Sequence, residues 1–346
     1  MATPHHPRRG SIGYYPRKRA KKMQGSIRSW PEIEGNPKLQ AFAGYKVGMT
    51  HIEFTDYRKS SVTAGKNIVS AVTVVEVPPL TVAAIRLYDE DETGLVVVYE
   101  KWADNLEKEV YYRITTPKEK TEKPLPESFS EVRVTVHTNP DKITGIPTKI
   151  PDLFEVRIGG GTLDARLKFA MEKLGKQVSF EDFSKPGNFV DVTAVTKGKG
   201  FTGHVERFGV KLLPRKNRKH RRMIGTLGPW HPDWVRFTVP QAGQMGSHQR
   251  TVPNIRVLKH GKTDGTDDIN VKGGFVGYGE VRSDYILLHG SIPGPSKRLV
   301  KLRDPSRQKS TNVDKLNISY ISKESKQGFF GFRNVFNLVF YYYWKF

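Results

Sequence analysis

The sequence of 346 residues contains no cysteine. This absence excludes disulfides and thiolate zinc sites, and with them the zinc-knuckle and zinc-ribbon modes of nucleic-acid binding, and it is consistent with a reducing compartment. The sequence also has no N-terminal signal peptide. Outside the extreme C-terminus it has no apolar stretch long enough to span a membrane. We therefore expect a chain that is not inserted in a membrane.

Acidic residues are few relative to basic ones. The chain has 35 Asp and Glu against 57 Lys and Arg, a formal net charge of +22 and a pI of about 9.9. This excess is far larger than solubility requires and indicates a polyanionic partner, of which nucleic acid is the first candidate and an anionic membrane surface the alternative. The densest acidic cluster, Asp89 to Glu92, is expected to lie in an exposed loop.

The basic charge is concentrated in residues 213–232, LPRKNRKHRRMIGTLGPWHP. Its apolar residues follow neither a helical nor a strand period, so the segment offers no face to a core. Ordering about 20 residues costs roughly 1 to 2 kcal/mol each, more than its few apolar side chains can offset. We expect the segment to become ordered only against a polyanion. A solvated basic loop or a nuclear-import run is the alternative.

The first 38 residues are predicted to form a basic arm. Residues 4–22, PHHPRRGSIGYYPRKRAKK, have no periodic apolar pattern. Tyr14, Tyr15 and Trp30 are interleaved with cations, as in segments that place guanidinium groups and rings on RNA. A solubilising terminus is the alternative.

The rest of the chain is predicted to be mainly β with an α+β insertion. Val- and Ile-rich runs between turn residues predict the strands 41–54, 68–77, 95–100, 130–138, 153–161, 189–196 and 254–261, with more strands within 272–290. Short strands separated by glycine indicate a barrel or a sandwich. Alternation at Val235, Phe237 and Val239 predicts a strand that returns from the basic loop.

Two helices are predicted in the inserted portion. The first covers 162–175, with Thr162 as its N-cap and Gly175 as its end. One face of it carries the apolar residues Leu163, Leu167, Ala170, Met171 and Leu174. A short second helix is expected to open at Ser179 and to end before Pro186. Residues 117–126, rich in Lys, Glu and Pro, are expected to form an exposed loop.

The stretch GKGFTG, with Gly198, Gly200 and Gly203, has the spelling of a dinucleotide-binding fingerprint. That site needs an amphipathic helix after the glycines and an acidic residue about 20 positions later, but Arg221 and Arg222 occupy that position. A kinase-type loop is excluded because no catalytic-loop signature follows. Close approach of the backbone to a phosphodiester is the better interpretation.

The histidines do not have the spacing of a metal or catalytic site. His231 and Asp233 could pair an imidazole with a carboxylate, but no nucleophile or second acid accompanies them, so an RNA-acting enzyme is only an alternative. We expect no cofactor and no metal. Trp230, between Pro229 and His231, is outside any periodic element, and stacking on a base is a better interpretation than burial in a core.

Several segments together resemble one family. The block GKGFTGHVERFGVKLLPRKNRKHRRMIGTLGPWHPDW, followed by VPQAGQMGSHQRT, closely resembles the universal large-subunit ribosomal protein of the L-three family in its archaeal and eukaryotic form. The segments PRRGSIGYYPRKRAKK, GYKVGMTHI and IPGPSKRLVKLR fit the same family. The resemblance covers about residues 5 to 328. Arg218 stands where eukaryotic members carry a histidine.

The resemblance implies a six-stranded translation-type β-barrel, an inserted α+β portion and two extended elements that reach into rRNA. The implied parts are the basic N-terminal arm 1–38, the first part of the barrel 39–75, the insertion 76–186, a barrel strand 187–200, the long basic central loop 201–250, the rest of the barrel 251–328, and an aromatic C-terminal extension 329–346 of unknown role.

The function implied is that of a structural constituent of the cytoplasmic large ribosomal subunit, not an enzyme. Family members bind large-subunit rRNA near its 3′ region, act early in subunit assembly, and extend a tryptophan-tipped loop toward the peptidyl transferase centre. The implied partners are large-subunit rRNA and neighbouring ribosomal proteins, with no membrane and no DNA. The matching loop tip here is Gly228, Pro229 and Trp230, and Gln241 to Gly246 match the family's Ala-Gly-Gln segment. The candidate rRNA-binding residues are Arg8, Arg9, Arg17, Lys18, Arg19, Lys21, Lys22, Lys197, Lys199, Arg207, Lys211, Arg215, Lys216, Arg218, Lys219, His220, Arg221, Arg222, Trp230, His231, Gln244, His248 and Arg250.

Overall fold

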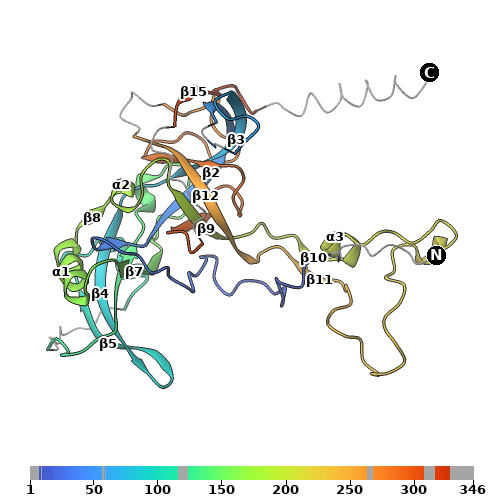
Figure 1. Cartoon of the computed structure of the whole chain (residues 1–346), viewed down its shortest axis with the longest axis horizontal. Helices are drawn as coiled ribbons and strands as arrows, with labels where there is room; N and C mark the ends of the chain where they lie inside the picture. The colour runs from blue at the N-terminus through green and yellow to red at the C-terminus, as the bar shows by residue number, and fades with distance from the viewer. Residues whose placement is uncertain are drawn as a thin grey trace. The chain divides into compact units, whose positions relative to one another are not determined.

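A computed structural model describes residues 8, 10–56, 58, 60–115, 124–262, 268–307 and 316–327. This part of the chain is mainly β and divides into two compact units (Figure 1). We call Met1–Met23 together with Val195–Arg250 the arm-and-loop unit, and Gln24–Ala194 together with Thr251–Phe346 the sheet unit. Arg9, the predicted extension 329–346 and most of the predicted loop 117–126 lie outside the described residues.

The larger sheet has seven strands in the described chain. They are β2 (Ala41–Thr55), β3 (Asn67–Glu76), β9 (Phe189–Val195), β12 (Gln249–Gly261), β13 (Tyr285–His289), β14 (Leu299–Arg303) and β15 (Ile318–Ile321). Their order is β14-β9-β12-β13-β3-β2-β15, and β14 also pairs with β2. Leu299 lies opposite Tyr45 in the β14–β2 pair, and Lys301 lies opposite Thr193 in the β14–β9 pair. Every strand of the set except β15 is therefore paired on both edges.

A second sheet is formed by the segment between β3 and β9 together with one short strand that precedes β2. Its strands are β1 (Lys38–Leu39), β4 (Leu80–Asp91), β5 (Gly94–Trp102), β6 (Glu131–His137), β7 (Leu153–Gly159) and β8 (Gln177–Val178). The order is β1-β7-β6-β4-β5, and β8 pairs with β4. Helix α1 (Leu163–Lys173) packs on β4, β6 and β7 (Figure 1), and α2 (Phe180–Phe183) follows β8. Two short 3-10 helices, η1 (Lys108–Tyr112) and η2 (Pro140–Lys142), connect the strands.

The predicted N-cap of α1 is confirmed, since the Thr162 side chain accepts a hydrogen bond from the Ala165 backbone N–H. The predicted apolar face is only partly correct. Ala170 is buried and Leu167 and Leu174 pack against the core, but Leu163 and Met171 are exposed. The helix therefore buries a narrower stripe than the spacing of its apolar residues suggested.

A buried ion pair links β9 to the end of β14. Asp191 is fully buried, and an Arg303 guanidinium nitrogen lies 2.5 Å from its carboxylate. The same carboxylate accepts hydrogen bonds from the backbone N–H groups of Asn254 and Ser306. A buried carboxylate satisfied in this way favours one arrangement of the three segments, because breaking any contact would leave a charge unpaired.

The strands predicted at 41–54, 68–77, 95–100, 130–138, 153–161, 189–196 and 254–261 are all confirmed. Among the strands of these two sheets, five were not predicted: β1, β4, β8, β14 and β15. The acidic cluster Asp89 to Glu92 is half-buried to exposed, as expected, but it lies at the end of β4 and in the turn to β5 rather than in a loop. This acidic cluster made the strand β4 unrecognisable from the sequence, although the residues of β4 before the cluster are almost all buried.

One strand prediction is correct only in part and another is wrong. The run 272–290 contributes only β13, because its glycines at 273, 274, 277 and 279 have positive φ and form turns. Residues 235–239 form turns and no strand. Phe237 is 70% exposed there, so the alternation of apolar residues has no sheet to pack against. Among the described residues, no helix is both long and apolar enough to cross a membrane.

Candidate nucleic-acid interface

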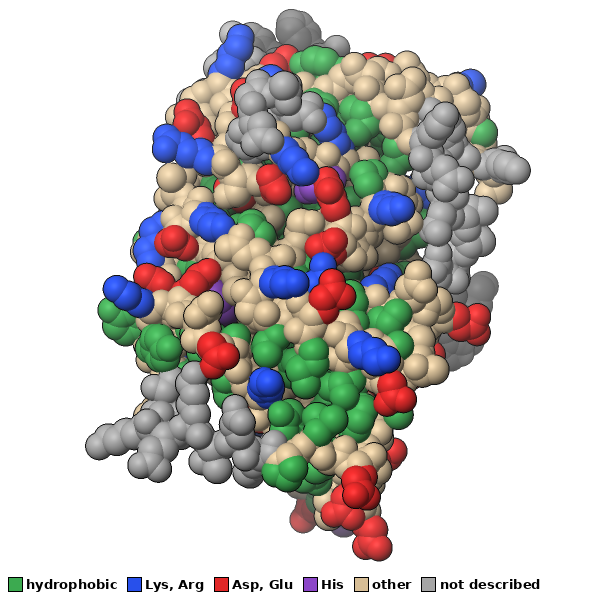
Figure 2. Space-filling model, turned by 90° about the vertical axis from the view of Figure 1, so that its left-hand side faces the viewer, with side chains coloured by type: hydrophobic (Ala, Val, Ile, Leu, Met, Phe, Trp, Pro, Cys, Tyr) green, Lys and Arg blue, Asp and Glu red, His purple; other side chains and the backbone are tan. Residues whose placement is uncertain are grey.

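The arm-and-loop unit holds most of the net charge of the chain. It contains 19 of the 57 Lys and Arg but only two of the 35 Asp and Glu, which gives it +17 of the total of +22. The sheet unit has nearly balanced charge. Figure 2, which views the side of the molecule that carries β4, β5 and α1, shows Lys and Arg interspersed with Asp and Glu. The arm and loop therefore carry almost only positive charge, and we expect a polyanion to be attracted there.

The central loop has no core of its own. Its base contains β10 (Gly200–Thr202), the short helix α3 (His204–Phe208) and β11 (Gly243–Met245), and β10 pairs with β11. From Gly209 to Met245 every residue is exposed or half-buried. Between Gly209 and Ala242 the only regular element is the 3-10 helix η3 (Arg218–His220), and Figure 1 shows the rest as an extended excursion. Burial of apolar area cannot hold this segment in place.

The predicted tip of the loop contains exposed aromatic residues. Trp230 is 89% exposed and Trp234 is 68% exposed. Gly228 and Pro229, which precede Trp230, are also exposed and lie in no helix or strand. An exposed tryptophan of this kind has both faces of its ring available for stacking. The structure thus places Trp230 outside any core.

Exposed basic side chains occur along both the arm and the loop. Most of the candidate residues are exposed: Arg8, Lys18, Arg19, Lys21, Lys22, Lys197, Lys199, Lys211, Arg215, Lys216, Arg218, Lys219, His220, Arg221, Arg222 and His231. Lys199 forms an ion pair with Glu206 at 2.9 Å, with both side chains about half exposed. Exposed ion pairs of this kind are weak, so Lys199 can exchange Glu206 for another anion.

Other candidate residues join the N-terminal arm to the base of the loop. Arg17 donates to the backbone carbonyl of Arg207 at 2.6 Å, and Arg207 donates to the carbonyls of Gln241 and Gln244 at 2.9 and 3.1 Å. Both guanidinium groups lie over the Phe208 ring, at 4.3 Å for Arg17 and 5.1 Å for Arg207. We call these residues the arm-loop junction. Burial lowers the pKa of Arg207 from its usual value.

Two further candidates, His248 and Gln244, also contact the protein itself. His248 is buried, and its Nδ1 lies 2.9 Å from the Lys18 carbonyl oxygen. Gln244 donates its amide to the carbonyl of Gly246 at 3.1 Å. Arg250 lies over the ring of Tyr14 at 4.4 Å. His248 and Arg250 thus position the arm against the loop base. Sequence reasoning missed these contacts because His248 and Lys18 are 230 positions apart in the chain.

Phe208 is the apolar centre of the arm-loop junction. It is only 4% exposed, and the Tyr15 ring lies 6.3 Å from it. The spelling ERFG offered a weak signal for it, since an aromatic residue directly before a helix-ending glycine often packs at the helix C-terminus. Gly209 does end α3, with φ of 65°.

Phe208→Ala is therefore expected to release the arm without unfolding the sheet unit. Large-to-small changes at a buried phenylalanine cost about 3 to 5 kcal/mol, and here the loss falls on arm docking. Limited proteolysis of the RNA-free protein should cleave within residues 8–23 much faster than in wild type. Phe201→Ala is the matched control, because Phe201 is in the same unit but 80% exposed. Equal cleavage of both variants would contradict the assigned role of Phe208.

The described residues contain neither a dinucleotide site nor a metal cluster. Gly200 has φ of 69° and Gly203 caps α3, but α3 has only five residues, and the next strand, β11, is antiparallel to β10 rather than parallel to it as a Rossmann site would require. The short helix itself was not expected. No group of three or more potential metal ligands occurs in the described chain. His231 and Asp233 are both exposed in the loop.

A mainly β chain that concentrates its net charge on an arm and a coreless loop has the features of a nucleic-acid-binding protein. Comparison with known proteins supports this class. The family model "Ribosomal protein L3" matches residues 1–130 and 119–328. The large ribosomal subunit protein uL3 of Thermoplasma volcanium is 66% identical over 330 residues, which is 95% of this chain and all of the relative. Those of Picrophilus torridus and Archaeoglobus fulgidus are 64% and 48% identical over 95% and 94% of this chain.

The chain belongs to the ribosomal protein L3 family, and its relatives place it in the archaeal type. The resemblance predicted from the central block is thus confirmed. The relatives are structural proteins of the large ribosomal subunit rather than enzymes, and the subunit is cytoplasmic.

Proposed function

We propose that this protein is a structural constituent of the large ribosomal subunit that binds large-subunit rRNA through its arm and central loop. The observation that carries the proposal is the loop from Gly209 to Met245, which has no buried residue and yet carries eight Lys and Arg against one Asp. Phosphates of a folded RNA can supply the contacts that the protein itself does not.

The proposal has three finer parts. The six-stranded barrel of the family is supported by the pairing of β14 with both β9 and β2. The insertion 76–186 corresponds to the segment that forms the second sheet and its helices. The barrel positions the protein near the rRNA 3′ region early in assembly, and the loop extends toward the peptidyl transferase centre with Trp230 at its tip.

The loop acts as a cationic strut. Phosphates crowded in folded rRNA repel each other, and Lys and Arg replace the diffuse counterions that would otherwise screen them. Arg215, Arg218, Arg221 and Arg222 add bidentate phosphate contacts that lysine cannot make. The alternative function, an RNA-acting enzyme, would use His231 and Asp233. Both residues are exposed at the tip, where nothing excludes water from them.

The function is tested by sedimentation. The native protein should co-sediment with large subunits at physiological salt and be released only by high salt. A free species that sediments away from subunits in cell extract would contradict the proposal.

Trp230→Ala is expected to leave incorporation into subunits intact and to alter rRNA structure only near the loop tip. Stacking on a base is worth about 1 to 3 kcal/mol, which is small beside the summed phosphate contacts of the loop. Chemical probing of rRNA in purified subunits measures the local effect, and subunit yield measures incorporation. Trp234→Ala is the control, since Trp234 is also exposed. Equal loss of incorporation and of rRNA structure near the tip would contradict the claim that Trp230 acts only locally.

A further inference from the structure

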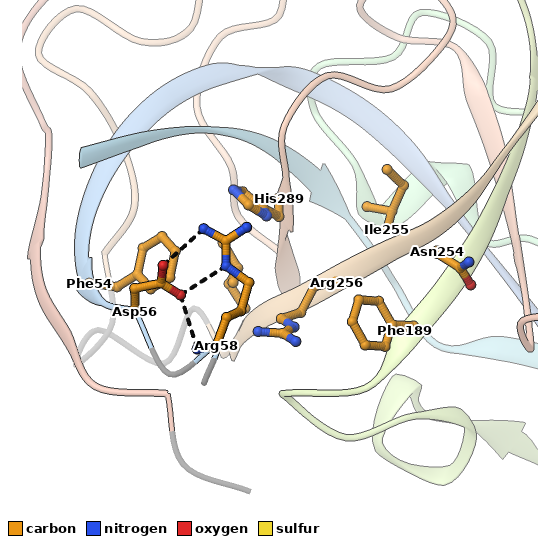
Figure 3. Close-up of a pocket in the computed structure, with 9 residues that line it drawn as sticks. Phe54, Asp56, Arg58, Phe189, Asn254, Ile255, Arg256 and His289 are labelled. Atoms are coloured by element: carbon orange, nitrogen blue, oxygen red, sulfur yellow. Dashed lines mark hydrogen bonds and ion pairs between the residues drawn. The ribbon is translucent and has the colours of Figure 1, made fainter. Parts of the chain in front are cut away.

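The sheet unit contains a pocket of about 190 Å³ that none of the candidate residues lines. It lies where β2, β9, β12 and β13 approach one another, and it is bounded by Phe54, Asp56, Arg58, Phe189, Arg256 and His289 among others (Figure 3). We call it the Arg256 pocket. Its charged lining residues are two arginines and one aspartate, so the charge balance among them decides what the pocket can hold.

Asp56 is the only carboxylate among the lining residues, and Arg58 already neutralises it. Arg58 Nε lies 2.9 Å from one carboxylate oxygen and its terminal nitrogen 2.9 Å from the other, while the Thr63 hydroxyl donates at 2.7 Å. These hydrogen bonds, led by the one from Arg58, hold the pKa of Asp56 well below its usual range. The carboxylate has little capacity left for a second cation.

Arg256 is the second cation, and it lacks such a partner. The residue is only 9% exposed, and its buried Nε has no hydrogen-bond acceptor. Its guanidinium lies 4.7 Å from the Phe189 ring centroid, and no carboxylate forms an ion pair with it in the described chain. Burial, and then the charge of Arg58, lower the pKa of Arg256. A buried guanidinium with free donors is costly unless an anion joins it.

The other groups around the pocket also favour an anion. Arg58 is bonded to Asp56 on one side, yet its side chain is 54% exposed. Figure 3 shows the His289 ring near the Arg58 guanidinium, on the side away from Asp56. Burial, and then the charges of Arg256 and Arg58, lower the pKa of His289, so this ring does not add a fixed charge. Two guanidinium forks beside apolar ring faces are suited to the tetrahedral oxygens of a phosphate group.

We propose that the Arg256 pocket binds a phosphate group of large-subunit RNA, as a contact on the sheet unit that is independent of the arm and loop. This inference rests on the proposed function for the identity of the polyanion. Arg256 supplies the unpaired donors, and Arg58 supplies the charge at the exposed side of the pocket. The site is thus the sheet unit's own point of attachment to RNA.

The test uses the full-length protein and a large-subunit RNA fragment, with affinity measured from 50 to 200 mM salt. Arg256→Gln should bind about 10-fold more weakly, and the slope of log affinity against log salt should become shallower by about 1. Arg282→Gln is the matched control, because Arg282 is 65% exposed on the same unit and outside the pocket. It should bind RNA like wild type.

The melting temperature without RNA separates binding from structure. Arg256→Gln removes an unpaired buried charge, so the RNA-free variant should melt no lower than wild type. A lower melting temperature together with unchanged RNA affinity would mean that Arg256 is structural and would overturn the proposal.

Inorganic phosphate distinguishes the source of the anion. If phosphate raises the melting temperature of wild type but Arg256→Gln binds RNA normally, the pocket takes a free anion and the RNA assignment is wrong. Normal RNA binding by wild type and by Arg256→Gln alike overturns the pocket alone and leaves the proposed function standing. Failure of wild type to bind the RNA overturns both.

Discussion

Replacement of the six loop cations by glutamine should weaken binding to large-subunit RNA on the order of 10³-fold at physiological salt. The six residues are Arg215, Lys216, Arg218, Lys219, Arg221 and Arg222. Each neutralised phosphate contributes about 0.7 to 0.9 to the slope of log affinity against log salt, so the slope should become shallower by about 4 to 5. All six side chains are exposed, and none has an acidic partner that the substitutions would leave unpaired in the described loop.

The control for this variant removes as many cations from the sheet unit. Exposed residues that serve are Lys101, Lys108, Lys142, Lys168, Lys262 and Arg282. The net charge of the two variants is the same, so a general loss of attraction would weaken both equally. The loop variant should also melt at the wild-type temperature, because the loop contributes no core. Equal RNA affinities of the two variants would show that the loop has no special role.

The arm, the loop and the pocket have different physical bases. Arg17, Arg207 and Phe208 use protein contacts to hold the arm at the loop base. The loop beyond Gly209 has cations without such contacts. Arg256 is buried and has no counter-ion in the described chain. We therefore expect RNA to order the loop and to neutralise Arg256, while the arm-loop junction is formed before RNA binds.

Sequence patterns predicted the elements whose residues are locally distinctive. β2 and β3 are long Val- and Ile-rich runs, and α1 has a threonine cap and a glycine end, so no distant information was needed. β4 was missed because its acidic end, Asp89 to Asp91, reads as a loop. β14 is only five residues long and gains its pairing from β2 and β9. Residues 235–239 show the converse error, in which alternation occurs without a partner strand.

The candidate interface could be predicted in part. Charge density and the absence of periodicity identified the loop, and both are properties of local sequence. The arm-loop junction could not be found in this way, because Arg17 and Arg207 are far apart in the chain and meet only after folding. The Arg256 pocket was missed for the same reason, since Asp56, Phe189 and Arg256 come from separate strands or their ends.

The largest expected contrast is in amide hydrogen exchange of the central loop between the RNA-free protein and the subunit. Backbone hydrogen bonds within residues 209–245 are few and local, such as Leu213 N–H to Arg221 C=O at 2.9 Å and Met223 N–H to His220 C=O at 3.0 Å. Without buried side chains to stabilise them, these bonds open at nearly no cost in free energy. Amides of β2 and β3 serve as internal references that are protected in both states.

The most direct test of the central claim is the exchange rate of residues 213–232 in the purified, RNA-free protein. The account predicts exchange close to that of an unstructured chain, with slowing on the order of 100-fold or more once the protein is in the large subunit. Strong protection of these amides in the absence of RNA would contradict it, because the loop would then hold its own structure.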